Sequence, residues 1–207
     1  MSKISDTKET DDEAYYHAVE AAIQYGSQSN KKFTSTDLNY SIQHIHNLLS
    51  DAMSLFKMGS FGSSTFLAIT SMEETAKIEL LAMRSFLKRN EKKVKGRDPL
   101  RDHYTKHVLA VRETTFMGRL PKLIGEDACK RLQSEVIAGK FRDIRERALY
   151  VHLDSSNIST PKDAITEARA HEMLLLAIEC ADDILIGYTN QSYEFGDRFE
   201  ELFAQLT

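Results

Sequence analysis

Proline, glycine and cysteine are scarce in this chain of 207 residues, which contains 3, 9 and 2 of them respectively. So few turn-forming residues argue against a β architecture, which needs a turn every 8–12 residues or so. A helical chain is the simplest interpretation. The two cysteines, Cys129 and Cys180, lie far apart in the sequence and have neither metal-ligand spacing nor the pattern of a disulfide framework. We expect both to be reduced core residues.

Long apolar runs are also missing. No stretch approaches the ~18 consecutive apolar residues of a membrane-spanning helix. The first residues, MSKISDTKETDDE, are polar and lack the apolar core of a signal peptide. The sequence therefore predicts a cytoplasmic protein with no membrane partner.

The charge is acidic overall but unevenly distributed. A formal net charge of −4 argues against a chain that binds nucleic acid over its whole surface. Between Lys88 and Lys106, however, eight residues are positively charged and three are negatively charged. A local positive site on an acidic body is compatible with an RNA or phosphate contact. A solvated connection between two helices is the alternative interpretation.

Hydrophobic spacing predicts an all-α, single-domain bundle of about six to seven helices over residues 12–207, after a disordered tail at residues 1–11. Ser35 or Thr36 is the expected N-cap of the second helix, and Gly59 and Gly62 are expected to end it. The segment 63–90 is apolar on all sides, which is typical of a central helix. The predicted helices cover residues 12–25, about 36–58, 63–90, 98–116, 126–151 with a bend or break near Gly139, 160–188 and 193–206.

The central segment 63–90 contains the unusual sequence Glu73-Glu74-x-x-Lys77. Charges on a helix that is apolar on every side must be paired or must face a site, because an unpaired buried charge is very costly. The structural interpretation is a Glu73–Lys77 ion pair, four residues apart, with a separate partner such as an arginine for Glu74.

Three histidines follow an arginine at a spacing that suits RNA cleavage without a metal. Histidine exchanges protons near neutral pH, so it suits the 2′-hydroxyl or the leaving 5′-oxygen, and arginine stabilises the charge on the phosphorane. An Arg-x4–6-His spacing is weak by itself. The two pairs between residues 97 and 107 are stronger because they lie in the positive segment, just after a helix start. The pairs are Arg97 with His103, Arg101 with His107, and Arg147 with His152.

Arg145, Arg147 and Tyr150 lie near the end of another predicted helix. They are suited either to holding the glutamates of the central helix or to gripping a phosphate. The sequence contains no zinc pattern, P-loop or dinucleotide fingerprint, so we expect neither a metal nor a cofactor.

In combination these segments resemble the AbiV family of abortive-infection (anti-phage) proteins, a HEPN-like family, over about residues 40–190. Two positions depart from the family pattern: Tyr104 follows His103, and His152 stands where the family usually has Asp. The segments that carry the resemblance are His46-Asn47-Leu48-Leu49-Ser50-Asp51-Ala52, Gly59-Ser60-Phe61-Gly62, Leu67 to Lys77, Asp102-His103-Tyr104-Thr105-Lys106, Arg145 to Val151, and Pro161 with the helix after it.

The resemblance implies a HEPN-like helical fold, a role in phage defence and a homodimer. Many HEPN proteins are RNases that place an Arg-x4–6-His motif at the dimer interface, whereas others lack a working motif. The resemblance therefore does not by itself imply catalysis.

Our leading hypothesis is a metal-independent endoribonuclease that halts phage production by cleaving RNA or blocking translation. Its expected partners are RNA or the translation machinery, with a phage protein as trigger. In this hypothesis the acid/base is His103 or His107 and the phosphate ligand is Arg97 or Arg101. The residues expected to organise the site or bind RNA are Glu73, Glu74, Lys77, Arg145, Arg147 and Tyr150. The alternatives are a non-enzymatic protein that inhibits translation or a phage protein, with a purely structural polar cluster, and a small-molecule sensor.

Overall fold

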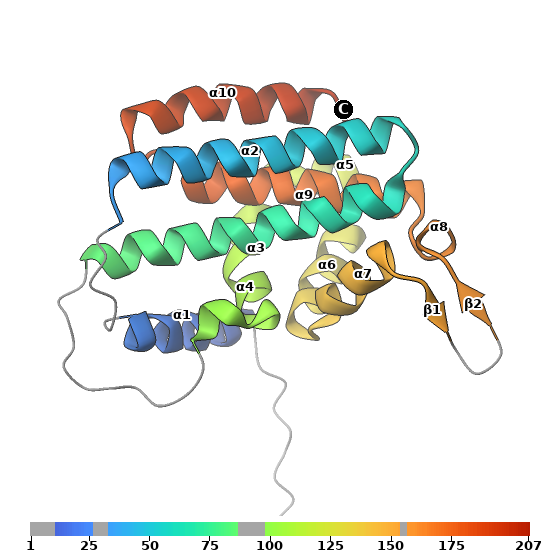
Figure 1. Cartoon of the computed structure of the whole chain (residues 1–207), viewed down its shortest axis with the longest axis horizontal. Coiled ribbons are helices and arrows are strands. Elements are labelled where there is room, and N and C mark those ends of the chain that lie inside the picture. Colours follow the sequence, from blue (N-terminus) through green and yellow to red (C-terminus); the bar gives the residue numbers. More distant parts are fainter. Residues whose placement is uncertain (1–10, 27–32, 87–97, 154–156) are drawn as a thin grey trace, which may run out of the picture.

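The computed structural model describes residues 11–26, 33–86, 98–153 and 157–207, and within these ranges the chain is almost entirely helical. The all-α prediction is confirmed, although the described residues form ten α-helices rather than six or seven (Figure 1). The elements are α1 (Asp11–Gly26), α2 (Ser35–Lys57), α3 (Phe61–Phe86), the 3-10 helix η1 (Pro99–Arg101), α4 (His103–Ala110), the 3-10 helix η2 (Thr114–Phe116), α5 (Leu120–Ile124), α6 (Glu126–Ile137), α7 (Lys140–Leu149), β1 (His152–Leu153), β2 (Ile158–Ser159), α8 (Pro161–Ala164), α9 (Glu167–Leu185) and α10 (Asn190–Ala204).

The larger number of α-helices has three sources: the break at Gly139, the division of the predicted helix 160–188, and α5, which forms where no helix was predicted. Two of the predicted helices are interrupted by a new N-cap. Asp102 has extended backbone angles and accepts a hydrogen bond from the backbone N–H of Thr105, so it ends η1 and starts α4. Thr166 likewise caps α9 by accepting from the backbone N–H of Arg169, directly after the short helix α8. Both side chains satisfy N–H groups that a new helix leaves unpaired. The predicted helices 98–116 and 160–188 are therefore each divided.

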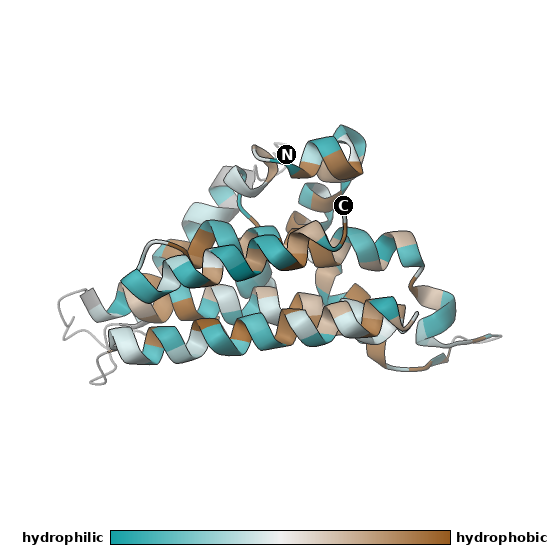
Figure 2. Ribbon diagram, turned by 90° about the horizontal axis from the view of Figure 1, so that it is seen from above, coloured by the Kyte–Doolittle hydropathy of each residue, from teal (hydrophilic) through white to brown (hydrophobic). Residues whose placement is uncertain are grey.

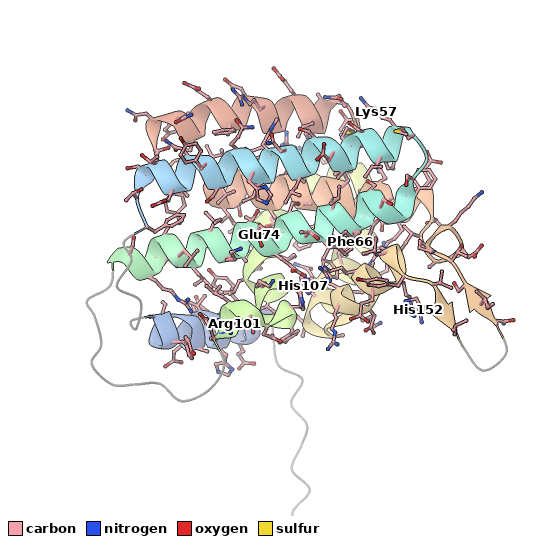
Figure 3. The ribbon with its side chains drawn as sticks, viewed as in Figure 1. Lys57, Phe66, Glu74, Arg101, His107 and His152 are labelled. Carbon is pink, nitrogen blue, oxygen red and sulfur yellow. The ribbon has the colours of Figure 1, made fainter. Side chains whose placement is uncertain are left out.

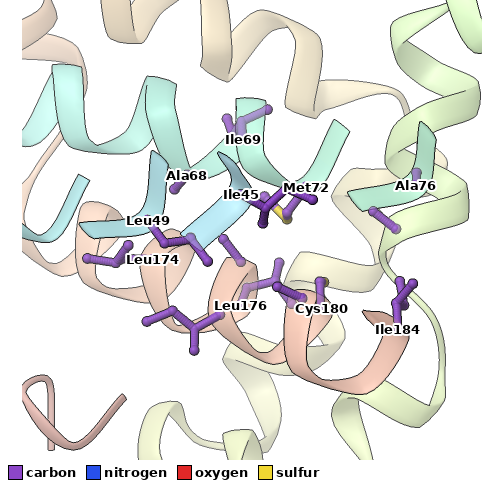
Figure 4. Packing of buried hydrophobic residues seen from close by; sticks show 14 of the residues in the cluster. Ile45, Leu49, Ala68, Ile69, Met72, Ala76, Leu174, Leu176, Cys180 and Ile184 are labelled. Atoms are coloured by element: carbon purple, nitrogen blue, oxygen red, sulfur yellow. The ribbon is translucent and has the colours of Figure 1, made fainter. Parts of the chain in front are cut away.

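The long helix α3 lies at the centre of the molecule and contacts α2, α9, α4 and α7 (Figure 1). Its partners α2 and α9 complete the main core, in which Ile45, Leu49, Ile69, Met72 and Leu176 have no exposed surface (Figure 4). Hydrophobic and hydrophilic residues alternate along the long helices in Figure 2, as expected for helices that bury one face. The prediction that the segment 63–90 forms the central helix is confirmed for the part up to Phe86.

The two glycines between α2 and α3 have different roles. Gly59 has a φ of +75°, which suits the chain reversal that ends α2. Gly62, predicted to break the helix, lies inside α3. A Cβ at this position would approach the carbonyl oxygen of Ala148 at 2.6 Å and the Cβ of Pro161 at 2.8 Å. Glycine is therefore needed at residue 62 because α3 packs closely against the ends of α7 and α8.

Other boundaries differ in detail. Thr34, rather than Ser35 or Thr36, caps α2, in a capping box with Asp37. Two short antiparallel strands, β1 and β2, in which Leu153 pairs with Ile158, lie between the predicted helices 126–151 and 160–188. Gly139 has a φ of +69° and separates α6 from α7, so the predicted break there is confirmed. The predicted N-terminal tail and Arg97 lie outside the described residues, apart from Asp11, which belongs to α1.

Candidate functional site

The candidate site is centred on Glu73, which α3 directs towards α4 and α7. Glu73 is only 3% exposed, and its carboxylate accepts three hydrogen bonds from α4. Oε1 is 2.8 Å from Nδ1 of His103 and 3.0 Å from Nε2 of His107, and Oε2 is 2.9 Å from Nζ of Lys106. An ionised carboxylate only accepts hydrogen bonds, so we assign a proton to each of these two ring nitrogens.

The short helix α4 supplies all three of these donors because of their spacing. Residues 103, 106 and 107 are three and four positions apart, so they share one face of the helix. The Asp102 cap fixes where this helix begins, and so which side chains are turned towards α3. Sequence spacing and a single cap therefore bring His103, Lys106 and His107 to one carboxylate.

Arg145 approaches the same carboxylate from α7. Its Nε lies 3.5 Å from Oε1 of Glu73, and its guanidinium carbon lies 4.6 Å from the centre of the Phe66 ring. The aromatic face holds the guanidinium by a cation–π contact, while the carboxylate supplies the opposite charge. Three helices thus converge on Glu73, and we call Glu73, His103, Lys106, His107 and Arg145 the Glu73 cluster.

The electrostatics of the Glu73 cluster favour the ionised carboxylate. Burial alone would raise the pKa of Glu73, but the hydrogen bonds and charges of His107 and Lys106 outweigh it and lower this pKa to about 2. One carboxylate faces two permanent cations, Lys106 and Arg145, so the cluster has an excess positive charge even when both imidazoles are neutral. Such a site attracts an anion, and a phosphate group fits this requirement.

The two histidines of the cluster differ sharply in accessibility. The side chain of His107 has no exposed surface and packs against the Phe141 ring, 5.8 Å away between ring centres. The side chain of His103 is 40% exposed. Because its Nδ1 is engaged by Glu73, Nε2 is the nitrogen that remains for a ligand. His103 therefore has the geometry of an oriented proton-transfer group, whereas His107 is a buried part of the network.

Glu74 and Lys77 lie away from the Glu73 cluster. Lys77 donates to Glu74 at 2.5 Å, so the predicted Glu73–Lys77 pair is replaced by a Glu74–Lys77 pair three residues apart. Both residues line a groove of about 500 Å³ between α2 and α3. The adjacent glutamates project about 100° apart around α3, which separates them into different surroundings.

The remaining predicted site residues are exposed. Arg101 ends η1 with an exposed side chain, and Arg147 and Tyr150 are exposed at the end of α7. His152 is half-buried on β1, and its label lies well to the right of that of His107 in Figure 3. Of the predicted residues, the structure brings together Glu73, His103, His107 and Arg145.

Two residues of the site were absent from the predicted set. Lys106 was recognised only as part of the positive segment, although it lies three residues after His103 and next to His107, a spacing that places it on the same helix face. Phe66, which supports Arg145, had no distinguishing signal because it is one apolar residue among many in α3.

In the part of the chain that the structure describes, no group of three or more His, Cys, Asp or Glu side chains is arranged to hold a metal ion. None of the helices in these ranges is both long enough and apolar enough to cross a membrane.

Comparison with known proteins identifies the family of this chain. A model of the AbiV family, described as HEPN_AbiV, matches residues 38–182, which include the whole Glu73 cluster. Neither the curated proteins nor the solved structures contain a match. Because the matched region covers well over half of the chain, this protein belongs to the AbiV family of HEPN-type proteins.

Proposed function

We propose that this protein is a phage-defence endoribonuclease that cleaves RNA at the Glu73 cluster without a metal ion. One observation carries the proposal: Glu73 binds Nδ1 of His103 at 2.8 Å, while 40% of the His103 side chain stays exposed. A carboxylate that holds one ring nitrogen of a histidine fixes the ring orientation and leaves the other nitrogen for proton transfer.

The chemistry uses the 2′-hydroxyl of the RNA as the nucleophile. Nε2 of His103 accepts the proton of the 2′-hydroxyl, the 2′-oxygen bonds to the phosphorus, and the bond from phosphorus to the 5′-oxygen breaks. Arg145, whose side chain is 24% exposed, stabilises the charge that builds on the phosphorane oxygens, and the mostly buried Lys106 adds positive charge behind it. The products are a 2′,3′-cyclic phosphate and a 5′-hydroxyl end.

The leaving 5′-oxygen needs a proton, and His103 of a second copy of the chain is a suited donor. The fully buried position of His107 makes it unsuited to protonating a substrate atom directly. The homodimer implied by the family resemblance supplies the second imidazole. The cytoplasm, where RNA and the translation machinery are found, is the compartment that this function requires.

The test is cleavage of single-stranded RNA by the purified protein in EDTA, comparing wild type with His103→Ala. We expect the variant to lose about 10²–10⁴-fold in rate, the usual contribution of a general acid or base. Because His103 is half-exposed, the variant should retain its helical circular dichroism. An RNA with a single 2′-deoxy sugar at the cleavage position should resist the wild-type protein.

The matched control is His44→Ala, which removes an exposed histidine on α2, outside the Glu73 cluster. This variant should cleave RNA and protect cells from phage as the wild type does. Identical RNA products from wild type and His103→Ala, with both proteins folded, would rule out the nuclease mechanism.

A non-enzymatic binding protein is the second candidate, and the burial of the cluster favours it. The side chains of Glu73, Lys106 and His107 are 4%, 10% and 0% exposed, as expected for a polar network that specifies the packing of α3 and α4. In that case His103→Ala would still protect cells from phage while no RNA is cleaved by either protein. Phage plating with this one variant therefore separates the two functions.

A further inference from the structure

A separate pocket of about 300 Å³ lies at the other end of α4. Its walls come from α1, from the residues at and after the C-terminal end of α4, and from α6. Val108, Val111, Val136 and Ile137 make much of the lining apolar. The volume is at the lower end of the range found for small-molecule sites. The pocket is therefore suited to a compact ligand rather than to a peptide.

Two adjacent tyrosines of α1 form an aromatic corner of this pocket. The rings of Tyr15 and Tyr16 are 6.0 Å apart between centres and meet edge to face, at 71°. Tyr16 is 68% exposed although it lines the pocket, so much of this large ring remains available for contact. Aromatic faces of this kind bind flat ring systems by stacking.

Arg112 supplies a rigid polar group beside the aromatic corner. Its guanidinium carbon lies 5.5 Å from the centre of the Tyr15 ring, and the group forms an ion pair with the buried Glu79 of α3. The side chain of Arg112 lines the pocket and is 21% exposed, so an acceptor oxygen or nitrogen on a ligand can approach its exposed part.

The charge around the pocket selects against anionic ligands. Arg112 is already balanced by Glu79, and Glu113 adds a second carboxylate at the pocket wall. Gln133 and Thr114 offer uncharged hydrogen-bonding groups. This lining fits a ligand that is flat, uncharged and able both to donate and to accept hydrogen bonds.

We propose that the pocket formed by Tyr15, Tyr16, Arg112 and Gln133 binds a nucleobase in the form of a neutral nucleoside. The base stacks on the tyrosines, its acceptor atoms face Arg112, and its amino or imino groups meet Gln133 or Glu113. This site is distinct from the Glu73 cluster and does not depend on the protein being a nuclease.

Isothermal titration calorimetry of the full chain with adenosine, uridine and adenosine monophosphate tests the proposal. We expect a Kd on the order of 0.1 mM for adenosine, as typical ligand efficiencies give for a molecule of this size. Uridine should bind more weakly because its ring is smaller. The monophosphate should bind roughly threefold or more weakly than adenosine because of the two carboxylates.

Tyr16→Ala should weaken adenosine binding by roughly tenfold, since stacking on an aromatic side chain contributes about that much for one base. The matched control is Tyr193→Ala, which removes a similarly exposed tyrosine from α10 and should leave the Kd unchanged. Gln133→Trp, which fills the pocket from α6, should abolish binding while circular dichroism shows that the fold is retained.

Three results would overturn the proposal. One is the absence of any heat of binding with several millimolar adenosine. Another is equal binding by wild type and Tyr16→Ala, which would place the ligand elsewhere. The third is binding of toluene but of neither nucleoside, which would identify the pocket as an apolar cavity without polar recognition.

Discussion

Glu73 and Glu79 lie on the same helix and are each 3% exposed, and yet their pKa values are shifted in opposite directions. The pKa of Glu73 is lowered to about 2, whereas burial raises the pKa of Glu79 above its ordinary value. Glu73 receives hydrogen bonds from three side chains of α4. Among the residues that the structure describes, Glu79 pairs with one cation, Arg112, and the carboxylate of Asp183 opposes its ionisation.

The difference shows that the number of donors decides in which direction the pKa of an equally buried carboxylate is shifted in this core. Several converging donors compensate the loss of hydration, whereas one arginine compensates it incompletely. Glu73 is therefore a stable anion surrounded by excess positive charge, which is a suitable arrangement for binding a phosphate. The Glu79–Arg112 pair is closer to electrically neutral and holds one arginine in place beside a pocket.

The largest effect is expected from Glu73→Gln. This change leaves Lys106 and Arg145 without their counter-charge in a mostly buried location, and breaking such a pair costs about 3–5 kcal/mol. For a chain of this size the melting temperature should fall by about 10 °C or more. Thermal unfolding followed by circular dichroism measures the change. A decrease of only one or two degrees would show that the network contributes little to stability.

The next largest effect is a dependence of stability on pH. The contribution of Glu73 is fully present above about pH 4.5, the ordinary value for glutamate, and is lost as the pH falls towards 2. The shift corresponds to about 3 kcal/mol in the free energy of unfolding. Glu79 acts in the opposite direction, because lowering the pH removes its unfavourable buried charge. Urea unfolding between pH 2 and 5 should therefore show a flatter profile for Glu73→Gln than for wild type, whereas Glu79→Gln should change the profile only above about pH 4.5, where the Glu79 charge develops.

A smaller effect is expected from Glu79→Gln at neutral pH. Burial already disfavours the charge on Glu79, so the net contribution of its ion pair is limited, and we expect a loss of about 1 kcal/mol. Measured under the same conditions, this loss should be less than half of that for Glu73→Gln. Equal losses of stability for the two variants would show that the larger number of donors to Glu73 gives it no greater contribution to stability than Glu79 has.

The smallest effect is expected from Glu74→Gln, the neighbour of Glu73 in the sequence. Its partner Lys77 is 38% exposed, and pairs of this kind contribute about 0–0.5 kcal/mol. The melting temperature should change by no more than about 2 °C. A larger decrease would mean that the groove between α2 and α3 depends on this pair.

The sequence alone predicted the helical class, the central position of α3 and most helix limits. Periodic apolar residues and caps such as Asp102 act locally, so their effect does not depend on distant parts of the chain. The shared face of His103 and His107 on α4 follows from the same local geometry. Glu73 was chosen because a charge on a helix that is apolar on all sides must be paired or face a site. His103 was chosen for its spacing from an arginine, and Arg145 for its place near a helix end.

Only the tertiary structure decided which charges meet. The sequence offered Lys77 as a partner for Glu73, but the way α4 and α7 pack on α3 directs His103, Lys106, His107 and Arg145 there instead. The packing of these helices also gives His103 and His107 different exposures. It likewise shifts the pKa values of Glu73 and Glu79 in opposite directions. Hydrogen bonds and desolvation depend on atoms brought together from residues about 30 to 70 positions apart, and no local pattern in the sequence specifies those distances.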